Sequence, residues 1–135
     1  MRKISFLEKI NKVVVSFIIT MDEKEFDFLL KEGEGYNLEF KECESSDISK
    51  EICAFTNANG GKILIGISDK GEIKGINITN RLKSQIVNIG RNLDPKIKIS
   101  IDVFKDILII NIPEGKNKPY SVNGKFFIRY GPNSQ

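Results

Sequence analysis

The 135-residue sequence contains no histidine and only two cysteines. Without histidine, a Ser-His-Asp triad and a histidine-ligated metal centre are both excluded. Acid–base or metal chemistry must therefore come from carboxylate, lysine, tyrosine or cysteine side chains. Cys43 and Cys53 stand ten residues apart and neither belongs to a Cys-x-x-Cys motif, which argues against a zinc site or a redox motif. We expect both to be buried as small apolar groups in a reducing cytoplasm, the compartment that we predict for the protein.

The sequence also lacks an apolar run long enough to cross a membrane. The apolar stretch 13–19 covers seven residues and no small-residue cleavage site follows it, so it predicts neither a transmembrane helix nor a signal peptide. Two interpretations of residues 1–20 remain open. They form an added helix or strand, or they are an extension upstream of a natural start at Met21. We therefore expect the folded domain to span residues 21–135.

The composition is that of one globular domain, with 40% hydrophobic and 29% charged residues. The net charge of +3 is unevenly distributed along the chain. Residues 1–72 carry 10 Lys/Arg and 14 Asp/Glu, a net of −4, whereas residues 73–135 carry 11 and 4, a net of +7. A basic half suggests a polyanionic partner, although lysines that only fill solvent-exposed faces would give the same count.

The apolar periodicity predicts an α+β fold. Helical spacing predicts helices over 22–30, 47–57 and 79–93, and alternation predicts strands over 36–41, 62–67, 72–76, 96–103, 107–112 and 126–130. We expect a mixed sheet of about six strands with two to three helices that cover one face. The stretch 107–112 is almost wholly apolar, which predicts a central strand. The run 57–61, Asn-Ala-Asn-Gly-Gly, is interpreted as the punctuation that ends a helix.

The first candidate for chemistry is Glu39-Phe40-Lys41, which lies on a predicted strand. Glu39 and Lys41 project from one face, as in metal-dependent nucleases, where a carboxylate holds Mg²⁺ or Mn²⁺ and an ammonium group offsets the charge of the attacked phosphate. A hard divalent cation needs several oxygen ligands, and Glu34 and Asp69 are the candidates to complete the set. The competing interpretation is a solvated strand face.

The second candidate is a basic, aromatic stretch near the end of the sequence, where cations alternate with aromatic residues around a Gly/Pro loop. This mixture suits contacts to backbone phosphates together with stacking on bases or sugars. The alternative is a solvated loop over a sheet edge. The candidate nucleic-acid-binding residues are Lys116, Lys118, Tyr120, Lys125, Arg129 and Tyr130.

Several ordered motifs then carry a family resemblance. The chain reads Asn-Leu-Glu-Phe-Lys-Glu over 37–42, Glu-Ile-Cys-Ala-Phe-Thr-Asn-Ala-Asn-Gly-Gly over 51–61, and Leu-Ile-Gly-Ile-Ser-Asp-Lys-Gly-Glu-Ile-Lys-Gly-Ile over 64–76. Lys-Pro-Tyr follows at 118–120, and Lys-Phe-Phe-Ile-Arg-Tyr-Gly at 125–131. Together these motifs resemble the Schlafen Alba-like domain over about residues 22–133.

The resemblance implies two versions of the function. Many prokaryotic members are DNA-binding modules at the front of transcriptional regulators. In the Schlafen proteins proper, a clamp of two such lobes cleaves tRNA and rRNA with a divalent metal and three carboxylates, whose positions match Glu34, Glu39 and Asp69. This chain departs from the pattern at Ser68, where many members carry an Asp, and it lacks the zinc element of the larger Schlafens.

The leading hypothesis is therefore a nucleic-acid-binding protein that acts as a metal-dependent endoribonuclease on structured RNA such as tRNA. The metal would be Mg²⁺ or Mn²⁺ on Glu34, Glu39 and Asp69, and Lys41 would offset phosphate charge. With a single lobe in the chain, we expect a homodimer whose two basic faces form the clamp. A non-catalytic DNA-binding module is the main alternative, and an interaction domain that binds no nucleic acid is the third.

Overall fold

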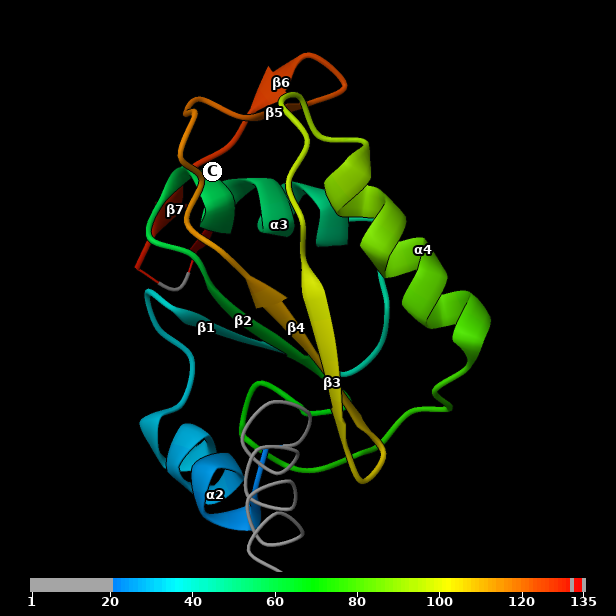
Figure 1. Ribbon diagram of the computed structural model, residues 1–135. Coiled ribbons are helices and arrows are strands. Elements are labelled where there is room, and N and C mark those ends of the chain that lie inside the picture. Colours follow the sequence, from blue (N-terminus) through cyan, green and yellow to red (C-terminus); the bar gives the residue numbers. More distant parts are fainter. Residues whose placement is uncertain (1–20, 132, 135) are drawn as a thin grey trace, which may run out of the picture.

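The computed structural model describes residues 21–131, 133 and 134, so both interpretations of residues 1–20 lie outside the described part of the chain. Three helices and eight strands alternate along it (Figure 1). In chain order they are α2 (Glu23–Glu32), β1 (Leu38–Lys41), α3 (Ile48–Asn57), β2 (Gly61–Ile65), α4 (Asn80–Arg91), β3 (Ser100–Phe104), β4 (Ile107–Ile112), β5 (Ser121–Val122), β6 (Lys125–Phe126), β7 (Arg129–Tyr130) and β8 (Asn133–Ser134). The predicted α+β class is confirmed.

Four strands form the main sheet, in the order β1-β2-β4-β3. β1 runs parallel to β2, while β4 is antiparallel to both β2 and β3, so the sheet is mixed. β4 lies between two neighbours and is buried at five of its six positions, which confirms the central strand predicted from its apolar run. Parallel pairing of β1 and β2 requires a crossover connection, and α3 supplies it.

Helices cover both faces of this sheet, and not one face as expected from the sequence (Figure 1). On one face, α3 and α4 pack against alternate residues of β2 and β4 in a core that includes Ile52, Phe55 and Ile86. On the other, Phe26 of α2 packs against the opposite residues of the same strands. The alternation of side chains across each strand supplies both apolar faces.

Two predicted strands do not join the main sheet. The stretch 72–76 makes a single bridge, between Ile67 and Ile73, because Gly66 and Gly75 adopt positive φ (115° and 75°) and curl the chain back on itself. The predicted strand 126–130 divides instead between two short ribbons, β5–β6 and β7–β8. This segment packs against α3, so it does not extend the edge of the sheet.

The helix ends follow from local chemistry. Asp22 caps α2 by accepting a hydrogen bond from the Glu25 N–H (2.8 Å), and Thr79 caps α4 by accepting one from the Leu82 N–H (3.1 Å). Cys53 is buried as expected, and burial raises the pKa of its thiol, whereas Cys43 is exposed because it lies in the loop between β1 and α3. Among the described residues, no helix is both long and apolar enough to span a bilayer.

Candidate nucleic-acid site

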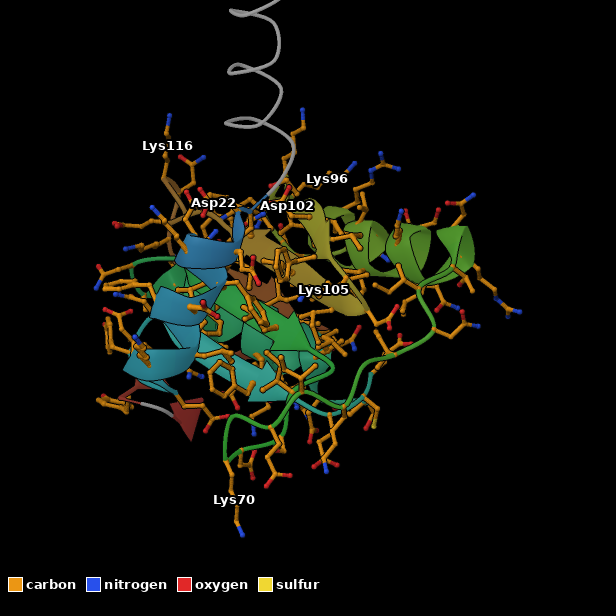
Figure 2. All side chains as sticks on the ribbon, turned by 90° about the horizontal axis from the view of Figure 1, so that it is seen from below. Asp22, Lys70, Lys96, Asp102, Lys105 and Lys116 are labelled. Carbon is orange, nitrogen blue, oxygen red and sulfur yellow. The ribbon has the colours of Figure 1, made fainter. Side chains whose placement is uncertain are left out.

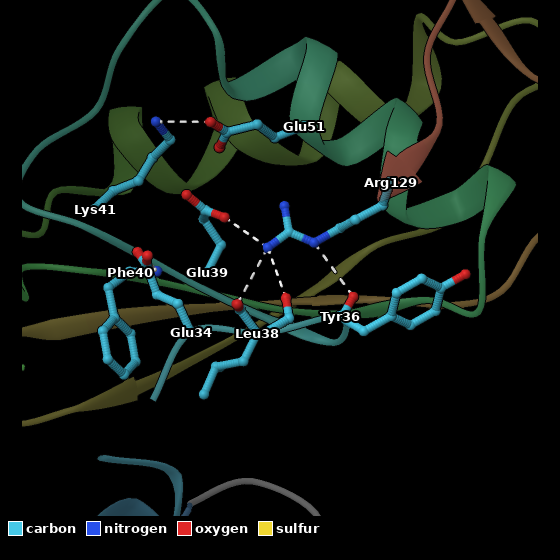
Figure 3. A network of polar contacts seen from close by, with 9 residues as sticks. Glu34, Tyr36, Leu38, Glu39, Phe40, Lys41, Glu51 and Arg129 are labelled. Atoms are coloured by element: carbon cyan, nitrogen blue, oxygen red, sulfur yellow. Dashed lines mark hydrogen bonds and ion pairs between the residues drawn. The ribbon is translucent and has the colours of Figure 1, made fainter. Parts of the chain in front are cut away.

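The strand that carries Glu39 and Lys41 alternates as predicted. Leu38 and Phe40 are buried in the core beneath α2, whereas Glu39 and Lys41 are half-buried and project toward α3 (Figure 3). The polar face of β1 is therefore covered by a helix and by the segment around β7, and each of its two charges meets a specific partner. This finding departs from the solvated strand face that we considered from the sequence.

Arg129 is the partner of Glu39. Its guanidinium is buried, with 2% of the residue exposed, and its Nη2 lies 2.6 Å from a Glu39 carboxylate oxygen. The same group donates hydrogen bonds to backbone carbonyl oxygens at the start of β1, namely those of Gly35 (2.9 Å), Tyr36 (3.2 Å) and Leu38 (3.2 Å) (Figure 3). Arg129 therefore anchors the segment around β7 to β1. This placement corrects the expectation that it lies on a phosphate-binding surface, because a guanidinium so buried cannot reach a phosphate.

Lys41 is paired in the same way, with a residue that the sequence analysis did not single out. Its Nζ lies 2.9 Å from one carboxylate oxygen of Glu51 on α3. The other oxygen of Glu51 is buried and has no hydrogen-bond partner among the described residues. Burial raises the pKa of the Glu51 carboxyl, the Lys41 ammonium opposes that shift, and the Glu39 charge adds to it. A signal for Glu51 existed, since it lies three residues after Ile48, on the apolar stripe of its helix.

Glu34 lies at the same end of β1. Its carboxylate accepts a hydrogen bond from the Phe40 N–H (3.0 Å). Desolvation raises the pKa of Glu34, the Phe40 hydrogen bond lowers it, and the charges of Glu39 and Asp69 raise it again. The three carboxylates of the predicted metal set therefore lie within electrostatic reach of one another.

The arrangement of these acids does not fit a metal ion as it stands. Carboxylate oxygens are the donors that Mg²⁺ and Mn²⁺ prefer. In the part of the chain that the structure describes, however, no three Asp, Glu, Cys or His side chains come close enough to hold an ion. One oxygen of Glu39 is engaged by Arg129 and one of Glu34 by the backbone of β1. As arranged, the cluster consists of buried charge pairs.

The basic stretch divides into exposed and buried residues. Tyr130 is 61% exposed, and Lys116, Lys118 and Lys125 also lie on the surface. Tyr120 is buried, and its hydroxyl accepts a hydrogen bond from the Asn117 N–H (3.2 Å). This placement corrects the expectation that Tyr120 offers a face for stacking. Its ring instead fills the core beneath the loop.

Two apolar side chains that the sequence analysis left out, Phe126 (60% exposed) and Ile128 (44%), lie on the same surface. An alternating apolar stretch is typical of a half-buried strand, so the sequence offered no sign of their exposure.

The side chain of Asn57 holds this stretch in place. Its amide donates to the carbonyl oxygens of Tyr120 (2.9 Å) and Phe127 (2.8 Å), and its own oxygen accepts from the Tyr120 N–H (2.6 Å). The run 57–61 does end α3, as predicted, but Asn57 has this second role as well. The sequence interpretation missed it because the partners lie more than 60 residues away.

The acids and the exposed lysines do not share one place. The loop 66–76, which carries Asp69, and the stretch 113–126 lie at opposite ends of the molecule in Figure 1. In Figure 2, Lys70 and Lys116 project from opposite sides. The structure therefore brings Glu34, Glu39, Lys41 and Arg129 together and places Lys116 apart from Asp69.

Comparisons with known proteins agree with this fold. A solved structure of the DIP2311 protein from Corynebacterium diphtheriae is similar, with a TM-score of 0.55 and 16% identity over 74% of this chain. This chain spans 22% of the length of that protein. The N-terminal domain of a putative ATP-dependent DNA helicase RecG-related protein from Nitrosomonas europaea has a TM-score of 0.42 and 16% identity, covering 66% of this chain and 71% of its own. The profile of the family described as Schlafen, AlbA_2 matches residues 34–135, well over half of the sequence, and the chain therefore belongs to the Schlafen AlbA_2 family.

Proposed function

We propose that this protein binds nucleic acid. The observation that carries the proposal is the family match over residues 34–135, which takes in the whole basic half of the domain. The exposed lysines of the stretch 113–128, which holds three lysines and one glutamate, support it. Lysine contacts to phosphates release counterions, and binding through them is therefore steeply dependent on salt.

The test is fluorescence anisotropy with labelled tRNA and labelled duplex DNA at several salt concentrations. We expect the dissociation constant to rise steeply with salt, and the triple variant Lys116→Ala, Lys118→Ala, Lys125→Ala to flatten the slope by up to about three phosphate contacts. A variant of three exposed lysines elsewhere, at Lys24, Lys31 and Lys70, is the matched control. An affinity independent of salt, or no binding to either probe, would leave the third hypothesis, a protein-interaction domain.

We further propose metal-dependent cleavage of structured RNA such as tRNA as a second candidate function. The mutual influence of Glu34, Glu39 and Asp69 favours it, because three carboxylates in electrostatic reach are the donor set for Mg²⁺ or Mn²⁺. A bound divalent cation would supply Lewis-acid chemistry. Lys41 would offset phosphate charge. The pairing of Glu39 with Arg129 and of Lys41 with Glu51 favours the alternative, a non-catalytic DNA-binding module.

Cleavage is best tested at Asp69, because it is exposed and its replacement leaves the buried charge pairs intact. The protein is incubated with tRNA and with duplex DNA, in Mn²⁺ or in EDTA. Cleavage of tRNA that needs Mn²⁺, is lost in Asp69→Asn and is kept in the exposed control Glu42→Gln supports the enzyme. Binding without cleavage in all three proteins supports the non-catalytic module. Glu39→Gln is a weaker probe, since it also disturbs Arg129.

We also propose a homodimer in which two basic faces form a clamp, and a cytoplasmic location. A closed twofold assembly is the commonest way for a single lobe to present two equivalent surfaces. Both cysteines are free within the described part of the chain, which suits a reducing compartment. Sedimentation with and without tRNA measures the assembly. A single protein chain per complex at saturating tRNA would contradict the clamp.

A further inference from the structure

The extended segment 125–130 has an apolar outer face. Phe126, Ile128 and Tyr130 are 60%, 44% and 61% exposed, whereas Phe127 is half-buried and Arg129 is buried. Alternation along an extended chain places the first three side chains on one side. Three large apolar side chains exposed within five residues form a contiguous patch, and such patches mark binding surfaces.

A hollow of about 280 Å³ opens beside this row. It is lined by Asn57, Lys118, Pro119, Phe126, Phe127 and Ile128. The Asn57 amide is already hydrogen-bonded to the backbone of the stretch that it holds, so it contributes no unpaired donor to the lining. The hollow therefore offers apolar and aromatic walls with one cation, Lys118, at its edge.

A second, more open hollow adjoins the first through Lys118. It is lined by Glu114, Gly115, Lys116 and Lys118 and has a volume of about 630 Å³. The Lys118 ammonium lies 3.0 Å from a Glu114 carboxylate oxygen, in an exposed pair that contributes little to stability. An anionic ligand can therefore displace Glu114 from Lys118 at small cost. One lysine thus stands between an apolar hollow and a basic one.

We infer that this pair of hollows binds unpaired nucleotides, with bases against Phe126 and Tyr130 and phosphates on Lys116, Lys118 and Lys125. The inference rests on the proposed nucleic-acid binding and narrows it to single-stranded segments. An unpaired base has an open face that stacks on an aromatic ring, whereas bases in a duplex are stacked on one another. A second copy of the chain is a poorer occupant, because a twofold contact would set these lysines against their own copies.

The test compares a labelled single strand of about ten nucleotides with a duplex of the same sequence, using anisotropy. We expect Phe126→Ala and Tyr130→Ala to weaken binding of the single strand by at least about fivefold and to leave duplex binding within about twofold. The matched control is Phe28→Ala, a phenylalanine of the same exposure (60%) on α2. Glu114→Gln removes the competing carboxylate and should tighten binding of the single strand.

A direct readout follows from the absence of tryptophan in the chain. Phe126→Trp introduces one fluorophore at the proposed contact, and we expect the single strand to quench its emission by stacking. Phe28→Trp should not respond. Circular dichroism checks that each variant is folded, which we expect because both positions are exposed.

The outcomes separate this inference from the proposal on which it rests. If the wild-type protein binds neither probe, the proposed function fails and the inference with it. If it binds both while Phe126→Ala and Tyr130→Ala behave like Phe28→Ala, only the inference is overturned. If the free protein is a dimer that Phe126→Ala converts to monomer without loss of strand binding, the row is a subunit interface and the inference is again overturned.

Discussion

One stretch of six residues, 125–130, contributes to two regions with opposite chemistry. On its inner side Arg129 enters a network of charges with Glu39 and the carbonyl oxygens of β1. On its outer side Phe126 and Tyr130 face solvent. The charged group is the buried one and the aromatic rings are the exposed ones, which reverses the usual distribution of residue types.

The difference shows which region stabilises the fold and which one is available for binding. A buried guanidinium is tolerated only when its donors are satisfied, and Arg129 meets a carboxylate, several carbonyl oxygens and the face of the Phe55 ring, 4.2 Å from its centroid. The outer row has no comparable contact to hold it. We therefore expect substitutions inside to change stability and substitutions outside to change binding.

The largest effect should come from Arg129→Ala. It leaves the half-buried Glu39 carboxylate without its partner and three carbonyl oxygens without a donor, and we expect the free energy of unfolding to fall by about 3–5 kcal/mol. Urea unfolding at neutral pH measures the change. Arg129→Lys keeps the charge but loses the forked geometry, so its loss should be smaller.

Lys125→Ala is the control on the same segment, because Lys125 is exposed. It should change the free energy of unfolding by no more than about 0.5 kcal/mol. If Arg129→Ala and Lys125→Ala unfolded at the same urea concentration, the division between an inner stabilising side and an outer binding side would be wrong.

A second, intermediate effect is expected from Asn57→Ala. The substitution removes three hydrogen bonds and leaves the Tyr120 N–H without its acceptor, which should cost about 1–3 kcal/mol. Because Asn57 also positions the loop beside Phe126, single-strand binding should weaken too. Asn59→Ala is the control, since Asn59 is exposed two residues further on. Equal stability of the two variants would show that the Asn57 hydrogen bonds contribute nothing net.

The smallest effect concerns Glu34 and depends on pH. Its pKa is raised in the folded protein above the ordinary value of 4.5, chiefly by desolvation. The folded state therefore binds more protons than the unfolded state just above pH 4.5, and this group makes stability fall as pH rises through that window. Glu34→Gln keeps an acceptor for the Phe40 N–H but does not titrate.

Relative to wild type, Glu34→Gln should therefore gain stability between pH 4 and pH 7, by less than about 1 kcal/mol because Glu34 is partly exposed. Thermal unfolding across this range measures it. The exposed Glu42→Gln should run parallel to wild type. A stability gap between Glu34→Gln and wild type that stays constant with pH would contradict the assignment.

Much of the fold could be predicted because its signals are local. The helices follow from apolar stripes with capping residues, and β4 follows from an uninterrupted apolar run. Other features depend on contacts between distant residues. The second helical face requires Phe26 to reach strands far along the chain, and β7 leaves the sheet because its segment packs on α3.

The candidate site was predictable in its residues and less so in their partners. The motif around Glu39 singled out the right strand, and the three acids do lie in electrostatic reach. Nothing in the local sequence distinguishes Arg129, which is buried, from Lys125, which is exposed four residues earlier. Their roles are decided by the carbonyl oxygens and the carboxylate that β1 presents, and these lie about 90 residues away.

That separation has a consequence for protein synthesis. Glu39 leaves the ribosome 90 residues before Arg129, an interval on the order of ten seconds. During it, the polar face of β1 has no guanidinium to satisfy its carbonyl oxygens. We therefore expect β1 to be protected from hydrogen exchange only after the segment around β7 has emerged, so that the ion pair reports a completed domain.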